Sequence, residues 1–239
     1  MALNYDFEWG LLLENPHKEW IIEGLAHTVG LSLTAWVIAL IIGILIGTIR
    51  MTQSPLLRFI GTAYVEFFRN IPLLVQLFIW FFVFPLMLPN DLMFAWNRLP
   101  HVPLITALLA LSLFTAARVA EHIRAGISSI PKGQFDAARS SGLTQVQMYR
   151  HVIIPYAFRV MIPTITSEFL TVFKNSALTL TIGVAEITGA AKAIEAWSFH
   201  GIEAYTVASV TYMTTTAIVV LFMSWLEHRL RIPGLIARK

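Results

Sequence analysis

Cysteine is absent from this chain of 239 residues, which excludes disulfides, a thiolate nucleophile and metal sites built on cysteine. Charged residues are also scarce, at 13% of the chain, whereas hydrophobic residues make up 56%. This balance is typical of integral membrane proteins, and we expect an all-α fold that spans the bilayer. The net charge of +3 is small. It is better explained by membrane topology than by binding of nucleic acid.

Nucleotide-binding and catalytic signatures are missing as well. No glycine is followed by lysine, so the chain lacks the Gly-Lys-Ser/Thr core of a P-loop. It also lacks the His-Glu-x-x-His pair of zinc hydrolases and the Gly-x-Ser-x-Gly turn of serine hydrolases. We therefore expect a protein that is not an enzyme, with no catalytic residue, no metal site and no cofactor of its own.

Hydrophobic segments long enough to cross a membrane recur along the chain. Thr28 to Ile49 is a run of 22 residues without charge, and about 20 such residues span the hydrocarbon core. Within it, Gly43 and Gly47 have the spacing that lets another helix approach closely. The segment 156–187 contains Pro163 and should be bent or discontinuous. In all we predict five transmembrane helices, at residues 28–49, 59–88, 104–124, 156–187 and 204–226.

Lysine and arginine residues predict the orientation of these spans, because such residues are enriched in cytoplasmic loops. Three lie in the segments placed outside: Lys18, Arg98 and Lys192. Eleven lie in the segments placed inside: Arg50, Arg58, Arg124, Lys132, Arg139, Arg150, Arg159, Arg229, Arg231, Arg238 and Lys239. The chain then divides into an external N-terminal segment (1–27), a single transmembrane domain (28–231) and a cytoplasmic tail (232–239).

A polar insert at residues 134–155 separates the third and fourth predicted spans. Gly142 can end a helix in the left-handed conformation, and Thr144 with Gln147 has the spacing of a capping box. The pattern predicts two short helices that meet at Gly142, with Pro155 marking the start of the next segment. From chemistry alone, such a pair could equally lie on the bilayer surface.

The same insert resembles the EAA loop of ATP-binding-cassette (ABC) importer permeases, the element that docks on the ATPase subunit in that family. The residues that match the loop's pattern are Asp136, Ala137, Ala138, Gly142 and Pro155. Asp136 stands where the family more often has glutamate, which keeps the charge and shortens the side chain. The resemblance implies a type I ABC importer transmembrane domain in a bacterial inner membrane, with a periplasmic N-terminus and a cytoplasmic C-terminus.

Three further stretches resemble the polar amino acid subfamily of these permeases: EFFRNIPLLVQL (66–77), TAARVAEHIRAGI (115–127) and TSEFLTVFKNSAL (166–178). The last two are particularly similar to glutamate/aspartate import permeases. The resemblance implies two copies of a cytoplasmic ATPase that binds ATP and Mg, a second and different permease chain, a periplasmic amino-acid-binding protein and an acidic amino acid as substrate. A permease for glutamine, arginine, lysine or histidine is the nearest alternative, and a secondary transporter a more distant one.

Four charged residues fall inside predicted spans: Arg118, Glu121, Glu168 and Lys174. Each costs about 2.5–3.5 kcal/mol at a lipid-facing helix centre, so we expect these side chains to face a cavity or one another. Glu66 and Arg69, three residues apart near the start of the second span, can pair on one helical face.

Substrate-binding residues are predicted from the same charges, namely Arg118, Glu121, Glu168, Asn175 and Ser176. Glu168 can hold the substrate ammonium, while Asn175, Ser176 and backbone N–H groups freed at a helix break suit the α-carboxylate. The guanidinium of Arg118 matches a carboxylate, which indicates a substrate with an acidic side chain. The alternative is that Arg118 pairs permanently with Glu121 or Glu168 and holds two spans together.

Overall fold

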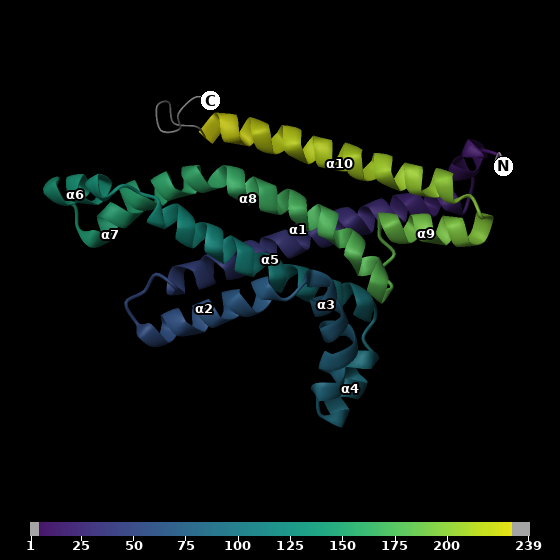
Figure 1. The fold of residues 1–239 in the computed structure, drawn as a ribbon, viewed down its shortest axis with the longest axis horizontal. Helices are drawn as coiled ribbons and strands as arrows, with labels where there is room; N and C mark the ends of the chain where they lie inside the picture. Colours follow the sequence, from purple (N-terminus) through teal and green to yellow (C-terminus); the bar gives the residue numbers. More distant parts are fainter. Residues whose placement is uncertain (1–4, 231–239) are drawn as a thin grey trace. The chain divides into compact units, whose positions relative to one another are not determined.

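The computed structural model describes residues 5–230, which are helical and contain no strand (Figure 1). The predicted all-α fold is therefore confirmed over these residues. The described chain divides into two compact units made of interleaved segments. The first unit comprises residues 5–37, 71–112 and 171–218, and the second comprises 38–70, 113–170 and 219–230. The positively charged tail, with Arg231, Arg238 and Lys239, lies outside the described residues.

The first unit is built around two helices that follow each other near the C-terminal end of the chain. Its helical segments belong to α1 (His17–Ile49), α3 (Leu73–Phe78), α4 (Asn90–Asn97), α5 (Val102–Ser128), α8 (Ile154–Ser176), α9 (Ile187–Ser198) and α10 (Gly201–Leu230). Ile187 and Ile194 of α9 pack with Ala204 and Ala208 of α10 in a buried core. Side chains of Trp20, Ile21 and Leu25 from α1 cover this core.

The turn before α9 is held by polar contacts from α1. Gly183 adopts a positive φ of 88°, which ends the preceding 3-10 helix at Ala177–Ile182. His27 Nδ1 lies 2.8 Å from the carbonyl oxygen of Ala185, and the backbone N–H of Ile187 donates to Thr28 Oγ1 at 3.1 Å. These contacts fix the start of α9 against the N-terminal part of α1.

The second unit contains α2 (Pro55–Asn70), α6 (Lys132–Ser140), α7 (Gln145–Met148) and the remaining parts of α1, α5, α8 and α10. Its α1 and α5 segments approach closely at two glycines. A Cβ atom on Gly43 would lie 2.6 Å from Val119 Cγ1, and one on Gly47 would lie 3.0 Å from the carbonyl oxygen of Ala120. The expectation that Gly43 and Gly47 admit a neighbouring helix is confirmed.

Several helix limits differ from the predicted spans. The predicted span 59–88 is wrong as one helix, because Pro72 lacks an N–H and disfavours a helical conformation at Ile71. Helix α2 ends at Asn70, α3 begins at Leu73, and the chain continues as a π-helix and a 3-10 helix through Met87. Helix α8 instead stays continuous through Pro163. Helix α1 begins at His17, within the segment predicted as the external N-terminus.

Three described helices are long and apolar enough to cross a membrane: α1, α5 and residues 201–226 of α10. The number rises to five if each of two broken pairs counts as one span. These pairs are α2 with residues 73–87, and residues 145–182 with α9. The division of the chain into 1–27, 28–231 and 232–239 stays a prediction.

Candidate functional site

The predicted helix pair of the polar insert is present and is capped as expected. Gly142, with φ of 76°, ends α6. Its N–H donates to the carbonyl oxygen of Arg139 at 2.9 Å, and the N–H of Leu143 donates to that of Ala138 at 3.3 Å. This pattern is a Schellman motif. At the start of α7, Thr144 Oγ1 accepts from the N–H of Gln147 while Gln147 Oε1 accepts from the N–H of Thr144, which completes the capping box.

The helix pair presents a polar face and is anchored on the other side. Ala138 and Met148 are buried, whereas Asp136 and Ala137 are exposed. Helix α7 runs through a π-helical turn (Tyr149–Ile153) into α8, whose residues 154–170 belong to the same unit (Figure 1). Pro155 is the second residue of α8 and directly follows the π-helical turn, which interrupts the regular α-helical hydrogen bonding before it.

Arg118 and Glu168 form a bidentate ion pair between α5 and α8 of the second unit. Arg118 Nε lies 2.6 Å from Glu168 Oε2, and Nη2 lies 2.7 Å from Oε1. His122 Nε2 lies 3.0 Å from the same Oε1. The Glu168 side chain is only 6% exposed, whereas that of Arg118 is 40% exposed. The guanidinium also lies over the Phe114 ring, 5.8 Å from its centroid.

This pairing leaves one edge of the guanidinium available. The two bonds to Glu168 use Nε and one N–H of Nη2, and arginine carries five N–H donors. The N–H groups of Nη1 and the second one of Nη2 point along the other edge of the fork. A second carboxylate can bind there without displacing Glu168.

Glu121 does not contact Arg118 but belongs to a separate cluster of arginines. The prediction that placed Glu121 with Arg118 among the substrate-binding residues is corrected on this point. Glu121 Oε2 lies 2.6 Å from Arg50 Nη1 and 3.7 Å from Arg69 Nη1, while Oε1 lies 2.5 Å from Arg124 Nη2. Both carboxylate oxygens are therefore engaged by other arginines. The expected pairing of Glu66 with Arg69 is likewise replaced, because Glu66 Oε2 accepts a hydrogen bond from Asn70.

Asn175 and Ser176 are the last residues of α8 and lie in the first unit, and the predicted discontinuity takes the form of a change from α-helix to 3-10 helix. The chain passes from α8 directly into the 3-10 helix Ala177–Ile182, whose i→i+3 hydrogen bonds keep the backbone N–H groups engaged. Ser176 is buried, and its Oγ donates to the carbonyl oxygen of Phe173 at 2.7 Å. Asn175 is half-buried.

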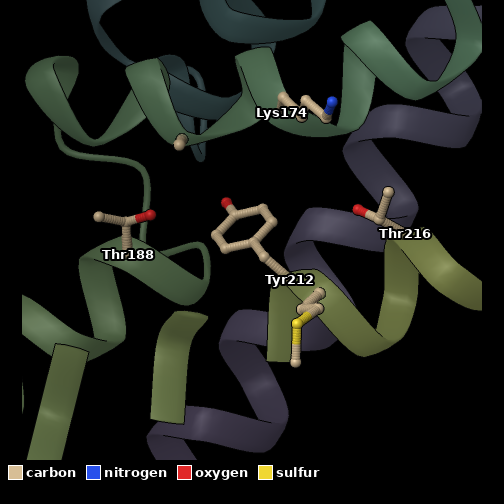
Figure 2. A pocket seen from close by; sticks show the side chains of 6 residues that line it. Lys174, Thr188, Tyr212 and Thr216 are labelled. Atoms are coloured by element: carbon tan, nitrogen blue, oxygen red, sulfur yellow. The ribbon is translucent and has the colours of Figure 1, made fainter. Parts of the chain in front are cut away.

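A hollow of about 430 Å³ lies beside these residues in the first unit. Lys174, Thr188 and Thr216 surround the ring of Tyr212 there (Figure 2). The Tyr212 hydroxyl donates to Glu186 Oε2, and Glu186 Oε1 accepts from the N–H of Gly189 at 2.9 Å. Glu186 is fully buried. The sequence analysis did not predict the contact between Tyr212 and Glu186, because Tyr212 lies in an uninterrupted apolar span. The position of Glu186 directly before α9, where it caps the helix, is the local feature that could have drawn attention to it.

Comparison with known proteins agrees with this architecture. Residues 39–232 match the family model described as binding-protein-dependent transport system inner membrane component. The glutamate/aspartate import permease protein GltJ of Escherichia coli strain K12 is 38% identical over 97% of this chain and 98% of its own. The probable glutamine ABC transporter permease protein GlnM of Bacillus subtilis strain 168 is 35% identical over 87% of this chain and 92% of its own.

A solved structure is similar over nearly the whole chain. The crystal structure of an amino acid ABC transporter with histidines has a TM-score of 0.82 and 30% sequence identity, and the match covers 94% of this chain and 100% of that one. The expected type I ABC importer fold is confirmed by this likeness. The chain is a membrane transport component and not an enzyme, and it belongs to the family of binding-protein-dependent transport system inner membrane components.

Proposed function

We propose that this chain is one permease subunit of an ATP-driven importer of L-glutamate and L-aspartate. The observation that carries the proposal is the half-exposed guanidinium of Arg118, which is fixed by Glu168 on one edge and open on the other. The similarity to GltJ, a glutamate/aspartate import permease protein, supports the same substrate class. The similarity to GlnM leaves glutamine as the alternative, and the charge of Arg118 favours an acid over an amide.

The ion pair serves both structure and recognition in this proposal. Glu168 lies on the buried side of Arg118 and holds the guanidinium in place. The side-chain carboxylate of the substrate accepts a second pair of hydrogen bonds from the opposite edge of the guanidinium. Glu168 remains our proposed contact for the substrate ammonium, because within residues 5–230 its Oε2 accepts one hydrogen bond, from Arg118 Nε. Asn175 remains our proposed contact for the α-carboxylate, whereas the Ser176 hydroxyl already donates within its own helix.

The partners in this proposal are those that the resemblance to ABC importer permeases implies, and the exposed helix pair supports a cytoplasmic docking partner. Two copies of a cytoplasmic ATPase, which bind ATP and Mg, would grip Asp136, Ala137 and Gly142. Eleven basic residues in the loops placed inside against three outside put the N-terminus in the periplasm and the C-terminus in the cytoplasm. A second, different permease completes the pathway, and a periplasmic binding protein delivers the substrate.

The test is ATP hydrolysis by the reconstituted complex, stimulated by binding proteins loaded with glutamate, aspartate, glutamine or arginine. We expect stimulation by the two acids in the wild type. Arg118→Ala should raise the half-saturating concentration for the acids at least tenfold, a loss of about 1.4 kcal/mol, with unchanged basal hydrolysis. Arg118→Lys should raise the half-saturating concentration nearly as much, because an ammonium group cannot form the paired hydrogen bonds of a guanidinium with a carboxylate. Arg159→Ala, an exposed arginine of α8, is the matched control.

Two results would contradict the proposal. If Arg118→Ala responds to the acids as the wild type does, Arg118 does not contact the substrate, and specificity lies in another subunit. If vesicles that contain this chain accumulate glutamate from an ion gradient without ATP, the chain is a secondary transporter.

A further inference from the structure

We propose that Arg50, Arg69 and Arg124, gathered around Glu121, form a binding site for the phosphate of an anionic phospholipid headgroup. The cluster lies entirely within the second unit and is separate from the Arg118–Glu168 pair. The inference rests on the proposed function in one respect only, namely the orientation that places this end of α1 and α2 on the cytoplasmic side.

The cluster carries an excess of positive charge. Three guanidinium groups share one carboxylate, so the four side chains together bear a net charge of +2. Both oxygens of Glu121 already accept from arginine, at 2.6 Å from Arg50 and 2.5 Å from Arg124. An additional anion is needed to balance the remaining charge, since exposed guanidinium groups close to one another repel.

Two buried donors of the cluster lack an acceptor. The Arg50 side chain is only 7% exposed, and among the described residues its Nε has no hydrogen-bond partner. The Nε of Arg124 is also buried and without a partner in this part of the chain. Buried N–H groups are satisfied in nearly all native structures, by protein or by a bound molecule, so these two donors fit a site that is completed by an acceptor from outside the chain.

The backbone is shaped to hold Arg50 in this position. Arg50 directly follows the end of α1 at Ile49, where an arginine would ordinarily extend into solvent. It turns against α2 instead, because Gly61 leaves room for its stem: a Cβ atom on Gly61 would lie 2.7 Å from Arg50 Cγ. Arg69 and Arg124 form the open side of the cluster, with side chains 45% and 42% exposed.

The chemistry of the site fits a phosphate, and its surroundings fit a lipid. Phosphate oxygens match the forked donors of arginine. Basic pockets between helices near the cytoplasmic side of a membrane bind anionic headgroups. Helix α2 adds an apolar surface for acyl chains, because Phe59, Ile60 and Phe67 are exposed by 70%, 49% and 57%. A soluble phosphate compound would gain nothing from these side chains.

The experiment compares the thermal unfolding midpoint of the assembled complex in lipid nanodiscs, without amino acid substrate or ATP. The nanodiscs contain phosphatidylcholine alone, or phosphatidylcholine with phosphatidylglycerol. Inorganic phosphate is added to the phosphatidylcholine discs as a third condition, at matched ionic strength. Native mass spectrometry counts the phosphatidylglycerol molecules that remain bound.

We expect phosphatidylglycerol to raise the unfolding midpoint of the wild type. In the combined variant Arg69→Gln/Arg124→Gln this rise should fall by at least half, and the complex should retain one fewer phosphatidylglycerol molecule than the wild type for each copy of this chain. Arg58→Gln is the matched control, because Arg58 is an exposed arginine on the same helix α2 and should keep the full rise. If the combined variant does not assemble, Arg69→Gln alone tests the site, since its guanidinium has the longest contact with Glu121.

Three outcomes would overturn the inference: an equal rise in the cluster variants and the wild type, an equal loss in Arg58→Gln, or full replacement of the lipid effect by inorganic phosphate. The last result would assign the site to a soluble phosphate. None of these measurements involves transport or Arg118. Failure of this inference and failure of the proposed substrate are therefore told apart.

Discussion

Arg118 of α5 and Glu168 of α8 are joined by two hydrogen bonds of 2.6 and 2.7 Å, and the two side chains differ sharply in burial. The Glu168 side chain is 6% exposed and the Arg118 side chain 40% exposed. Loss of the arginine would leave a charged group stranded inside the protein, whereas the arginine itself keeps access to other partners. In this pair Glu168 is buried and fixed, whereas Arg118 is exposed enough to contact a ligand.

Removal of Arg118 alone should destabilise the subunit more than removal of both partners. We expect Arg118→Met to lower the stability by about 3 kcal/mol, at the low end for a broken buried ion pair because Arg118 is partly exposed. Arg118→Met combined with Glu168→Leu should recover most of this loss, since no buried charge remains. Thermal unfolding of the purified complex measures both effects.

The same variants separate a structural role from substrate recognition. The double variant should assemble and hydrolyse ATP at the basal rate, yet should not respond to acidic amino acids. Recovery of the response together with stability would show that the pair only holds α5 and α8 together, and would remove Arg118 from the substrate site.

Local features of the fold were predictable, because the residues that encode them are adjacent in sequence. Gly142 and the Thr144/Gln147 box act within a single turn, and both were placed correctly. The break at Ile71–Pro72 was missed because residues 70–88 carry no charge and read as part of a span, and hydropathy does not register the geometry imposed by a proline.

The candidate site was only partly predictable, because its contacts join distant parts of the chain. Charges inside spans marked Arg118, Glu121 and Glu168 as unusual, and left Arg118 either to bind the substrate or to pair with Glu121 or Glu168. The structure joins Arg118 to Glu168, 50 positions away, and joins Glu121 both to Arg124 of the same helix and to Arg50, 71 positions away. Which of several arginines meets which carboxylate is decided by helix packing, and no local pattern encodes it.

The turn between α6 and α7 should control coupling to the ATPase without controlling the fold. Gly142 has a φ of 76°, and an L-residue in that conformation costs about 1–2 kcal/mol. We expect Gly142→Ala to weaken co-purification of the ATPase and to lower substrate-stimulated hydrolysis, while the unfolding midpoint of the permease falls by no more than this local cost predicts.

Gly133→Ala is the control for this turn, because Gly133 lies in α6 and a Cβ atom there would meet nothing within 4 Å. It should couple as well as the wild type. If both variants couple normally, the geometry at Gly142 is not what the ATPase recognises.

Two glycines of α1 should respond in opposite directions to the same substitution. Gly43→Ala places a methyl group 2.6 Å from Val119 Cγ1 and 3.0 Å from the carbonyl oxygen of Ala116, and such overpacking costs about 1–3 kcal/mol. Gly30→Ala meets nothing within 4 Å and gains up to about 1 kcal/mol from the higher helix propensity of alanine. Unfolding midpoints should therefore fall for Gly43→Ala and rise or stay level for Gly30→Ala. A fall of equal size in both would mean that helix flexibility, and not close packing of α1 against α5, explains the glycines.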